Sequence, residues 1–192
     1  CGKGGGNEDG TGSGPGPTVV RPTPEGEPRR VRLGFSSVPP ELTSEAYVQA
    51  FATAAQYSET VLIQRAPPWQ DFFPGGQVSS ETADTTRIET DLLEQYGHLE
   101  LVYAIDPTDG VVQRSRLANL PAGADAQLGF NDADIRNAFI AYAAYVAKNY
   151  RPEYMALGVE INMTYERNPE QFAAFEMLYA EAYAIVKGNS PE

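Results

Sequence analysis

Hydrophobic and polar positions alternate most clearly in residues 154–162, Tyr-Met-Ala-Leu-Gly-Val-Glu-Ile-Asn. In an extended strand, successive side chains point to opposite faces, so one face of this segment is large and apolar throughout. The other face begins small and ends polar, with Glu160 and Asn162 last. A strand of a closed barrel has this pattern, because its outer face packs on helices and its inner face lines a crowded lumen. The segment therefore predicts a barrel strand with functional groups at its C-terminal end.

Three earlier segments also read as strands, and a helical pattern follows each of the four. The expected strands are residues 31–37, 60–65, 99–106 and 154–162, and the expected helices are residues 43–57, 81–96, 131–150 and 168–188. Alternation of this kind predicts an α/β fold of parallel strands joined by right-handed crossovers.

The inner faces of these strands distinguish a barrel from an open sheet. Strands of an open, doubly wound sheet are apolar on both faces, since helices cover both. Here one face of each strand is small or polar, which favours the barrel. A complete (β/α)8 TIM barrel takes about 250 residues. Residues 31–192, which number 192 − 30 = 162, supply four βα units, so we expect half of a (β/α)8 barrel with four strands and four helices.

Residues 1–30 differ from the rest of the chain, because they are rich in Gly and Pro and poor in large apolar side chains. Such a composition predicts a disordered tether. The single cysteine, Cys1, precedes this tether, and this arrangement resembles the mature N-terminus of a bacterial lipoprotein, whose first cysteine carries lipid. The resemblance implies a lipid anchor at Cys1 and a place in the bacterial cell envelope, periplasmic or at the cell surface. The alternative is a sequence boundary that happens to fall on a cysteine.

Charge narrows the class of ligand. Four basic and four acidic residues in positions 1–30 cancel, so the formal charge of −12 belongs to residues 31–192. Nucleic acid requires a basic surface, so this balance argues against it. It suits a neutral ligand such as a sugar, although an acidic surface also serves solubility.

The four units, together with Gly158-Val159-Glu160-Ile161-Asn162, resemble the large clan of retaining glycoside hydrolases built on the TIM barrel. In that clan the fourth strand ends in the general acid/base glutamate, so the resemblance implies this role for Glu160. The clan usually has Asn directly before that glutamate, whereas Val159 stands there in this chain. Strand alternation would place Asn162 on the same face as Glu160, where its amide could bind a sugar hydroxyl.

Retaining hydrolysis needs two carboxyl groups about 5–5.5 Å apart. The clan's nucleophile is a glutamate on strand seven, which has no counterpart among the four units. Asp106, at the end of the neighbouring strand, is the other carboxylate expected near Glu160, in the first place as a binding residue.

Other residues at the expected strand ends also suit a carbohydrate. Trp69, Phe72 and Phe73 lie in the loop after the second strand, where an exposed aromatic ring could stack on a sugar. The alternative, which applies to the two Phe in particular, is that these side chains pack the loop against the barrel. Arg65 could bind hydroxyl groups or hold Glu160 ionised, or instead pair with Asp71. Ser36 ends the inner face of the first strand. The sequence contains no Cys/His metal-ligand spacing and no Gly-rich phosphate loop on a helix, so we expect no metal and no cofactor.

Three functions stay open at this point: a membrane-tethered glycoside hydrolase, a non-catalytic carbohydrate-binding surface lipoprotein, and a structural fragment without activity. We expect membrane contact only through the lipid. We also expect these 192 residues alone to be inactive and to self-associate through the open edges of the half barrel.

Overall fold

The computed structural model describes residues 31–41, 43–110 and 113–189 of the chain. Within them, four strands form one all-parallel sheet in the order β1-β2-β3-β4. Neighbours in the sheet are therefore also neighbours in the sequence. The expected α/β class and parallel sheet are confirmed. The strands are β1 (Gly34–Ser36), β2 (Thr60–Arg65), β3 (Glu100–Ile105) and β4 (Tyr154–Ala156).

Six helices occur in the described part of the chain. They are α1 (Ser44–Tyr57), α2 (Trp69–Phe72), α3 (Ser80–Gln95), α4 (Ala133–Tyr150), α5 (Ile161–Arg167) and α6 (Pro169–Asn189). The side chain of Thr43 caps α1 by accepting a hydrogen bond from the Ala46 N–H, and Ser79 caps α3 in the same way from Thr82. Asn168 precedes Pro169 at the start of α6, as its cap signal predicts.

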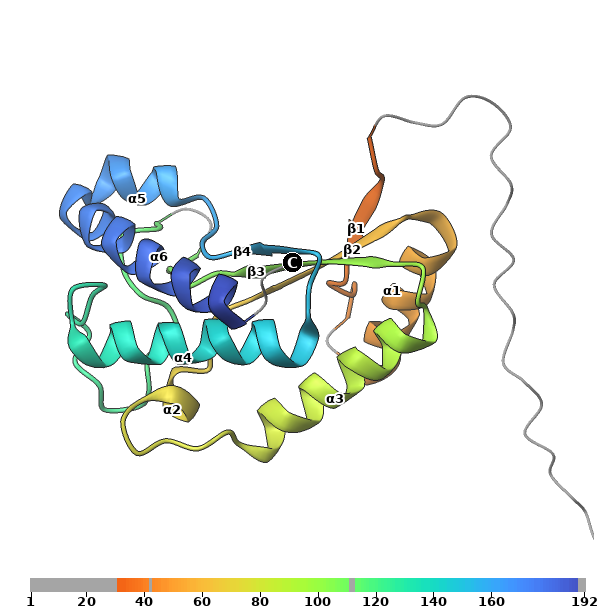
Figure 1. The fold of residues 1–192 in the computed structure, drawn as a ribbon, viewed down its shortest axis with the longest axis horizontal. Helices are drawn as coiled ribbons and strands as arrows, with labels where there is room; N and C mark the ends of the chain where they lie inside the picture. Colours follow the sequence, from red (N-terminus) through yellow and green to blue (C-terminus); the bar gives the residue numbers. More distant parts are fainter. Residues whose placement is uncertain (1–30, 42, 111–112, 190–192) are drawn as a thin grey trace, which may run out of the picture.

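Helices α1, α3 and α4 lie on one side of the sheet (Figure 1). Side chains at alternate positions of β2 and β3 point to this side and are buried together with the apolar faces of the three helices. Helix α6 packs against α4, where the ring of Phe175 meets Phe139 edge to face. This side is the core, and its strand residues are Val61, Ile63, Leu101, Tyr103 and Ile105.

The other face of the sheet is only partly covered. Leu62 and Val102 are half-buried there, and Gln64 is exposed. Arg32, just before β1, reaches across this face, donates a hydrogen bond to the Tyr154 hydroxyl of β4 at 3.2 Å, and forms an ion pair with Glu100. Side chains from the two outer strands thus meet over the same open face.

The fourth strand is much shorter than expected. It ends at Ala156, and the chain bends through residues 157–160 into helix α5. The predicted strand over 154–162 is therefore wrong after Ala156. At this bend Gly158 lies close against the Phe175 ring of α6, where a Cβ would be only 2.8 Å from the ring, so a side chain would not fit without a shift. Asn162 is consequently helical, and strand alternation does not relate it to Glu160.

The remaining corrections concern strand ends and one loop. The expected strands 31–37 and 99–106 are trimmed to the residues that find a partner in the sheet. The loop after β2 contains the short helix α2, and Trp69, expected to be exposed, is buried. Its indole N–H donates to the Ala118 carbonyl at 2.7 Å, which fastens this loop to the long loop after β3. Trp69 is thus a core residue, and Phe72 and Phe73 pack against the same core.

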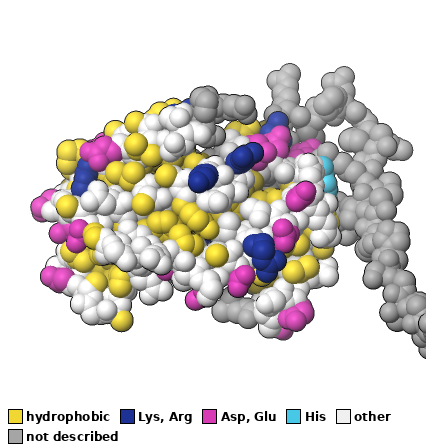
Figure 2. Space-filling view, turned by 60° about the horizontal axis from the view of Figure 1, so that its bottom comes forward, with side chains coloured by type: hydrophobic (Ala, Val, Ile, Leu, Met, Phe, Trp, Pro, Cys, Tyr) yellow, Lys and Arg dark blue, Asp and Glu magenta, His cyan; other side chains and the backbone are white. Residues whose placement is uncertain are grey.

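Among the described residues, positive and negative side chains are mixed on the helix side of the molecule (Figure 2). Figure 2 shows hydrophobic side chains in the middle of this face and charged ones spread around them. Among the described residues, no helix combines the length and apolarity that crossing a bilayer would require. Residues 1–30, where the sequence predicts a tether that begins at Cys1, lie outside the described residues.

The burial of Trp69 yields the first prediction. Trp69→Ala should lower the free energy of unfolding by about 3–5 kcal/mol, because it opens a cavity and frees the Ala118 carbonyl. Urea unfolding followed by circular dichroism measures this loss. Tyr165→Ala, at an exposed aromatic residue of α5, is the control and should cost less than about 1 kcal/mol. Equal losses in the two variants would show that Trp69 is not a core residue.

Candidate functional site

A buried arginine joins two carboxylates at the C-terminal edge of the sheet. The side chain of Arg114 is 3% exposed, and its Nε donates to Glu160 Oε2 at 3.0 Å. Its Nη1 contacts Asp106 Oδ1 and also donates to the Thr108 hydroxyl at 3.1 Å. Asp106 follows β3, and Glu160 precedes α5. One guanidinium group therefore brings together the two carboxylates that the sequence predicts at neighbouring strand ends.

The long loop after β3 is folded so that Arg114 points back at the sheet. Asp109 Oδ1 accepts hydrogen bonds from the backbone N–H groups of Ser115 and Arg116, which ties the stretch after Arg114 to Asp109. Helix α5 holds the same stretch from the other side: the Thr164 hydroxyl donates to the Arg114 carbonyl, and Arg167 donates to the Gln113 carbonyl, both at 2.8 Å. Backbone contacts on both sides thus fix the position of Arg114.

Two of the interacting residues have left-handed backbone conformations. Arg114 has φ of 46° and Glu160 has φ of 49°, values that non-glycine residues rarely adopt. Each such residue costs of order 1 kcal/mol or more and persists only where its surroundings impose it, which is common at functional sites. Here the strain directs both side chains toward each other.

The electrostatics of the cluster centre on Arg114. Burial alone would lower its pKa, but the hydrogen bonds and negative charges of Asp106 and Glu160 outweigh burial and raise it above the ordinary value. Arg114 is therefore a permanent cation with two anionic partners. Asp106 is mostly buried, whereas Glu160 remains 46% exposed, so Glu160 is the carboxylate that a ligand can reach.

Gln64 extends the cluster along the open face of the sheet. It is the fifth residue of β2, and its Nε2 donates to Asp106 Oδ2 at 2.8 Å. Asp106 thus accepts from Gln64 through one oxygen and from Arg114 through the other. Two further predicted site residues lie at this edge outside the cluster: Ser36 ends β1, and Asn162 is exposed in the first turn of α5.

Arg65 lies on the opposite face of β2, so it contacts neither Glu160 nor Asp71. Strand alternation places it with Val61 and Ile63 on the helix side. There its Nη2 donates to Glu89 of α3 at 2.5 Å. The expected contact with Glu160 is wrong, and Arg114 makes it instead. Asp71 accepts from the N–H and hydroxyl of Ser79. Burial would raise the pKa of Asp71, but hydrogen bonds from Thr82 and then from Ser79 outweigh burial and lower this pKa.

Glu89 is fully buried, with 0% exposure, and accepts hydrogen bonds from three different elements. Besides Arg65, its donors are the hydroxyl groups of Tyr47 in α1 and, at 2.5 Å, Tyr150 in α4. Burial first, and then the charge of Glu89, raise the pKa of both tyrosines, so they stay protonated donors. This network is structural and lies behind the site.

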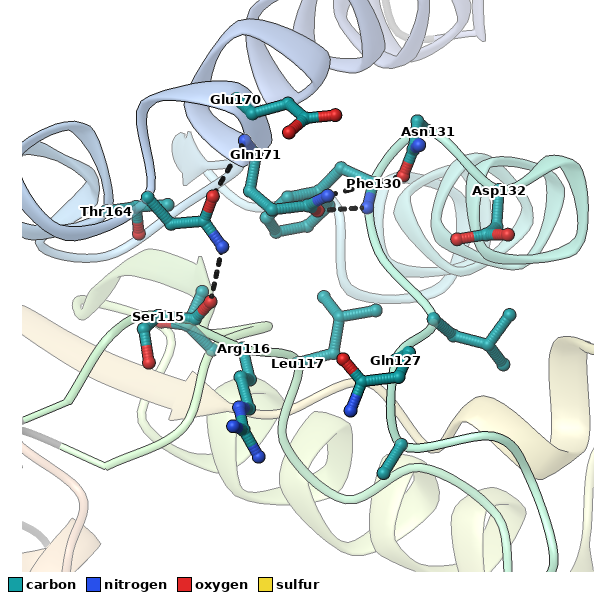
Figure 3. A pocket seen from close by; sticks show the side chains of 14 residues that line it. Ser115, Arg116, Leu117, Gln127, Phe130, Asn131, Asp132, Thr164, Glu170 and Gln171 are labelled. Atoms are coloured by element: carbon teal, nitrogen blue, oxygen red, sulfur yellow. Dashed lines mark hydrogen bonds between the residues drawn. The ribbon is translucent and has the colours of Figure 1, made fainter.

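A cleft of about 580 Å³ lies beside the Arg114 cluster, between the loop after β3 and helices α5 and α6 (Figure 3). Thr108 and Thr164 line it and also hydrogen bond to Arg114. Gln171 closes one side by accepting from the Phe130 N–H at 2.7 Å. The volume is typical of small-molecule sites. Its remaining lining includes buried Leu117 and exposed Arg116, Gln127 and Glu170.

Arg114 and Gln64 do not figure among the residues selected from the sequence. The irregular segment between β3 and α4 is long, which is typical of a functional loop. No local pattern, however, shows which of its residues points toward the sheet. Gln64 carries a clearer signal, because it shares strand alternation with the small and polar face.

No group of three or more His, Cys, Asp or Glu side chains that could hold a metal ion occurs within the described ranges. The sequence matches no protein-family model and no curated protein. The site is therefore interpreted from its own geometry.

The Arg114 cluster yields a pH-dependent prediction. Arg114→Met should destabilise the fold by about 2–3 kcal/mol at neutral pH, because two adjacent carboxylates lose their shared cation; the figure allows for the exposure of Glu160. The repulsion between the two carboxylates, and the attraction to Arg114 that the variant lacks, both require charged carboxylates, so the deficit should shrink at acidic pH, where carboxyl groups take up protons. Urea unfolding at pH 7 and pH 4.5 measures this change.

Arg116→Met is the matched control, since Arg116 is exposed and two residues away. Its effect should stay below about 0.5 kcal/mol at both pH values. A deficit in Arg114→Met that does not vary with pH would contradict the repulsion argument.

The hydrogen-bond network around Glu89 yields a further prediction about stability. Glu89→Gln should cost about 3 kcal/mol or more, because an amide cannot neutralise Arg65 and turns a donor toward other donors. Thermal and urea unfolding measure the loss. Glu94→Gln makes the same change at an exposed position of α3 and should be nearly neutral. A loss of unfolding free energy below about 1 kcal/mol in Glu89→Gln would show that this network contributes little to the packing of the helices on the sheet.

Proposed function

We propose that this chain is the first half of a (βα)8-barrel glycoside hydrolase, in which the C-terminal edge of the sheet binds a poly- or oligosaccharide and Glu160 is the general acid/base. The observation that carries this proposal is the pairing of Glu160 with Asp106 through one buried arginine at that edge. Parallel-barrel enzymes carry their chemistry at the C-terminal edge of the sheet.

The sheet supports the barrel part of the proposal in two ways. Its order, β1-β2-β3-β4, never reverses, whereas a doubly wound sheet reverses at a switch point. Its core-forming helices α1, α3 and α4 share one side, and the other face carries half-buried and polar side chains. Both features are typical of a barrel wall with a lumen face.

The Arg114 cluster is compatible with acid catalysis because it contains two carboxylates for one cation. A general acid must carry a proton, whereas an ion pair favours the charged carboxylate. When Glu160 takes up a proton, Asp106 still neutralises the buried guanidinium, so no uncompensated charge is left inside the protein. In this mechanism Asp106 positions Arg114, and the more exposed Glu160 meets the substrate.

The substrate is neutral in this proposal, which agrees with the acidic composition and with an edge where one arginine is paired with two carboxylates. The cleft beside the cluster offers hydroxyl-binding groups such as Gln127 and Arg116. Asn162 and Ser36 are proposed as further substrate contacts at the same edge. The nucleophile implied by the resemblance has no counterpart among the four units, so the 192 residues alone should bind sugar without cleaving it.

One observation favours a second function, a non-catalytic carbohydrate-binding surface lipoprotein. Arg114 pairs with both carboxylates of the edge, so both are already engaged, which leaves a site able to bind neutral hydroxyl groups without chemistry. In both versions we propose anchoring of the chain to the bacterial envelope through a lipid on Cys1, an inference that rests on the sequence.

The test uses the chain extended by the residues encoded after Glu192. Glu160→Gln in that protein should reduce turnover of glycosides with poor leaving groups by about 10²–10⁴-fold and should largely spare activated aryl glycosides, which leave without a proton. Glu166→Gln, at an exposed position of α5, is the control and should change neither rate. Steady-state kinetics on the two substrate types decides the role.

Equal losses on both substrates would remove the acid/base role from Glu160. Suppose that neutral polysaccharides in the gel slow the protein in affinity electrophoresis, but that the extended form cleaves none of them. This result would favour the binding function. Absence of both binding and cleavage would overturn the carbohydrate assignment.

A further inference from the structure

The β1 edge of the sheet presents apolar side chains without a helix above them. Phe35 pairs with Val61 in register, yet Phe35 is 45% exposed while Val61 is fully buried. Leu33, on the same face, is exposed as well. Helix α1 packs mainly on β2, so in the part of the chain that the structure describes this edge is an apolar strand without a helix over its outer side.

At the β4 edge, the described residues show an apolar helix face with no strand packed against it. Helix α6 extends past β4, and its Tyr179 and Tyr183 lie exposed with their rings stacked at 6.1 Å between centroids. The two tyrosines form one wall of a small groove with Met155 and Leu157 at its base. The outward residue of β4, Met155, is only half-buried. This edge is therefore an apolar helix face that lacks a strand.

From these two edges we infer that two copies of this chain associate, with β1 of each copy placed beside β4 of the other. A two-fold rotation about an axis along the strands keeps every strand parallel and repeats the order β1-β2-β3-β4. Leu33 and Phe35 of one copy then pack on Tyr179 and Tyr183 of its partner. The result is a closed sheet of eight strands without a free edge.

A second copy fits these edges because it supplies both missing parts at once. Its β1 is a parallel strand with an apolar outward face, and its α6 is a helix with an apolar uncovered face. Aromatic side chains bury roughly 150–250 Å² each when fully covered. Two junctions, each with Phe35 and two tyrosines that are about half exposed, together with their aliphatic neighbours, reach the roughly 1,000 Å² that a specific interface needs.

Charge gives the association a recognisable signature. Each copy carries a formal charge of −12, so the two copies repel each other while their apolar edges attract. Salt screens this repulsion, and the dimer should therefore strengthen as ionic strength rises. The inference concerns the 192 residues by themselves, because four further βα units in one longer chain would occupy the same two edges. It rests on the proposed barrel but not on glycoside chemistry, and its test measures mass rather than activity.

Sedimentation velocity of the 192-residue chain over a micromolar concentration series is the experiment. The wild-type chain should sediment as a dimer, and more completely at high salt. Phe35→Lys and Tyr183→Glu should each raise the dissociation constant at least about tenfold, because each breaks both junctions. Met177→Glu, on the opposite face of α6, is the matched control and should leave the dimer unchanged.

Mixing the two variants tests the arrangement itself. A mixed dimer of Phe35→Lys with Tyr183→Glu has one wild-type junction and one with facing Lys and Glu, so mixing should restore dimers that neither variant forms alone. Circular dichroism verifies that both variants are folded, and Leu33→Lys replaces Phe35→Lys if that variant is not.

Three results would overturn the inference. A monomeric wild-type chain at every salt concentration would leave the edges to another chain segment or another protein. A dimer that survives both substitutions would use a different surface. If the mixture of the two variants formed no dimers, the packing of β1 from one copy against α6 of the other would be excluded.

Discussion

The fold depends on one buried carboxylate. Glu89 of α3 has no contact with solvent and accepts hydrogen bonds from Tyr47 of α1, Arg65 of β2 and Tyr150 of α4. A buried charge is costly unless it is paired and hydrogen-bonded, so these elements can pack only in positions that bring their donors to Glu89. Apolar contacts hold the three helices to the sheet, and Glu89 specifies how they sit on it.

This constraint reaches the candidate site through the backbone. Arg65 ends β2 with its side chain on the helix side, and its carbonyl accepts a hydrogen bond from the Asp106 N–H at 2.9 Å. Asp106 in turn directs its carboxylate to the open face, where Arg114 binds it. The half-buried Arg65 and the buried Arg114 therefore lie on opposite faces of the sheet at neighbouring strand ends. One ion pair lies behind the sheet and the other lies in front of it.

The same architecture explains why the site and the apolar edges coexist. Parallel strands that never reverse order place every strand end on one edge, where Asp106 and Gln64 gather. Four such strands, with core helices on one side, leave an open face and two unpaired strand edges. Carbohydrate chemistry and association between copies are thus separate proposals, carried by different residues of one sheet.

Local sequence determined the elements whose signals are short-range. The cap at Thr43 and the alternation in residues 60–65 predicted α1 and β2 with their bounds, and the start of α6 followed from Asn168 and Pro169. Strand alternation likewise separated the side chains of β3 into a helix-facing and an open-facing set. These properties depend on neighbouring residues and on periodicity, which a sequence displays directly.

Tertiary contacts decided the rest. The alternation in residues 154–162 fits a strand, but Gly158 lies against the Phe175 ring and the chain turns into α5. Trp69 suits an exposed loop by position, yet a distant carbonyl at Ala118 and the core bury it. Arg114, between Asp106 and Glu160, depends on hydrogen bonds from α5, 50 residues away along the chain. Glycine, tryptophan and arginine each accept several environments, so only the packing of remote segments selects one.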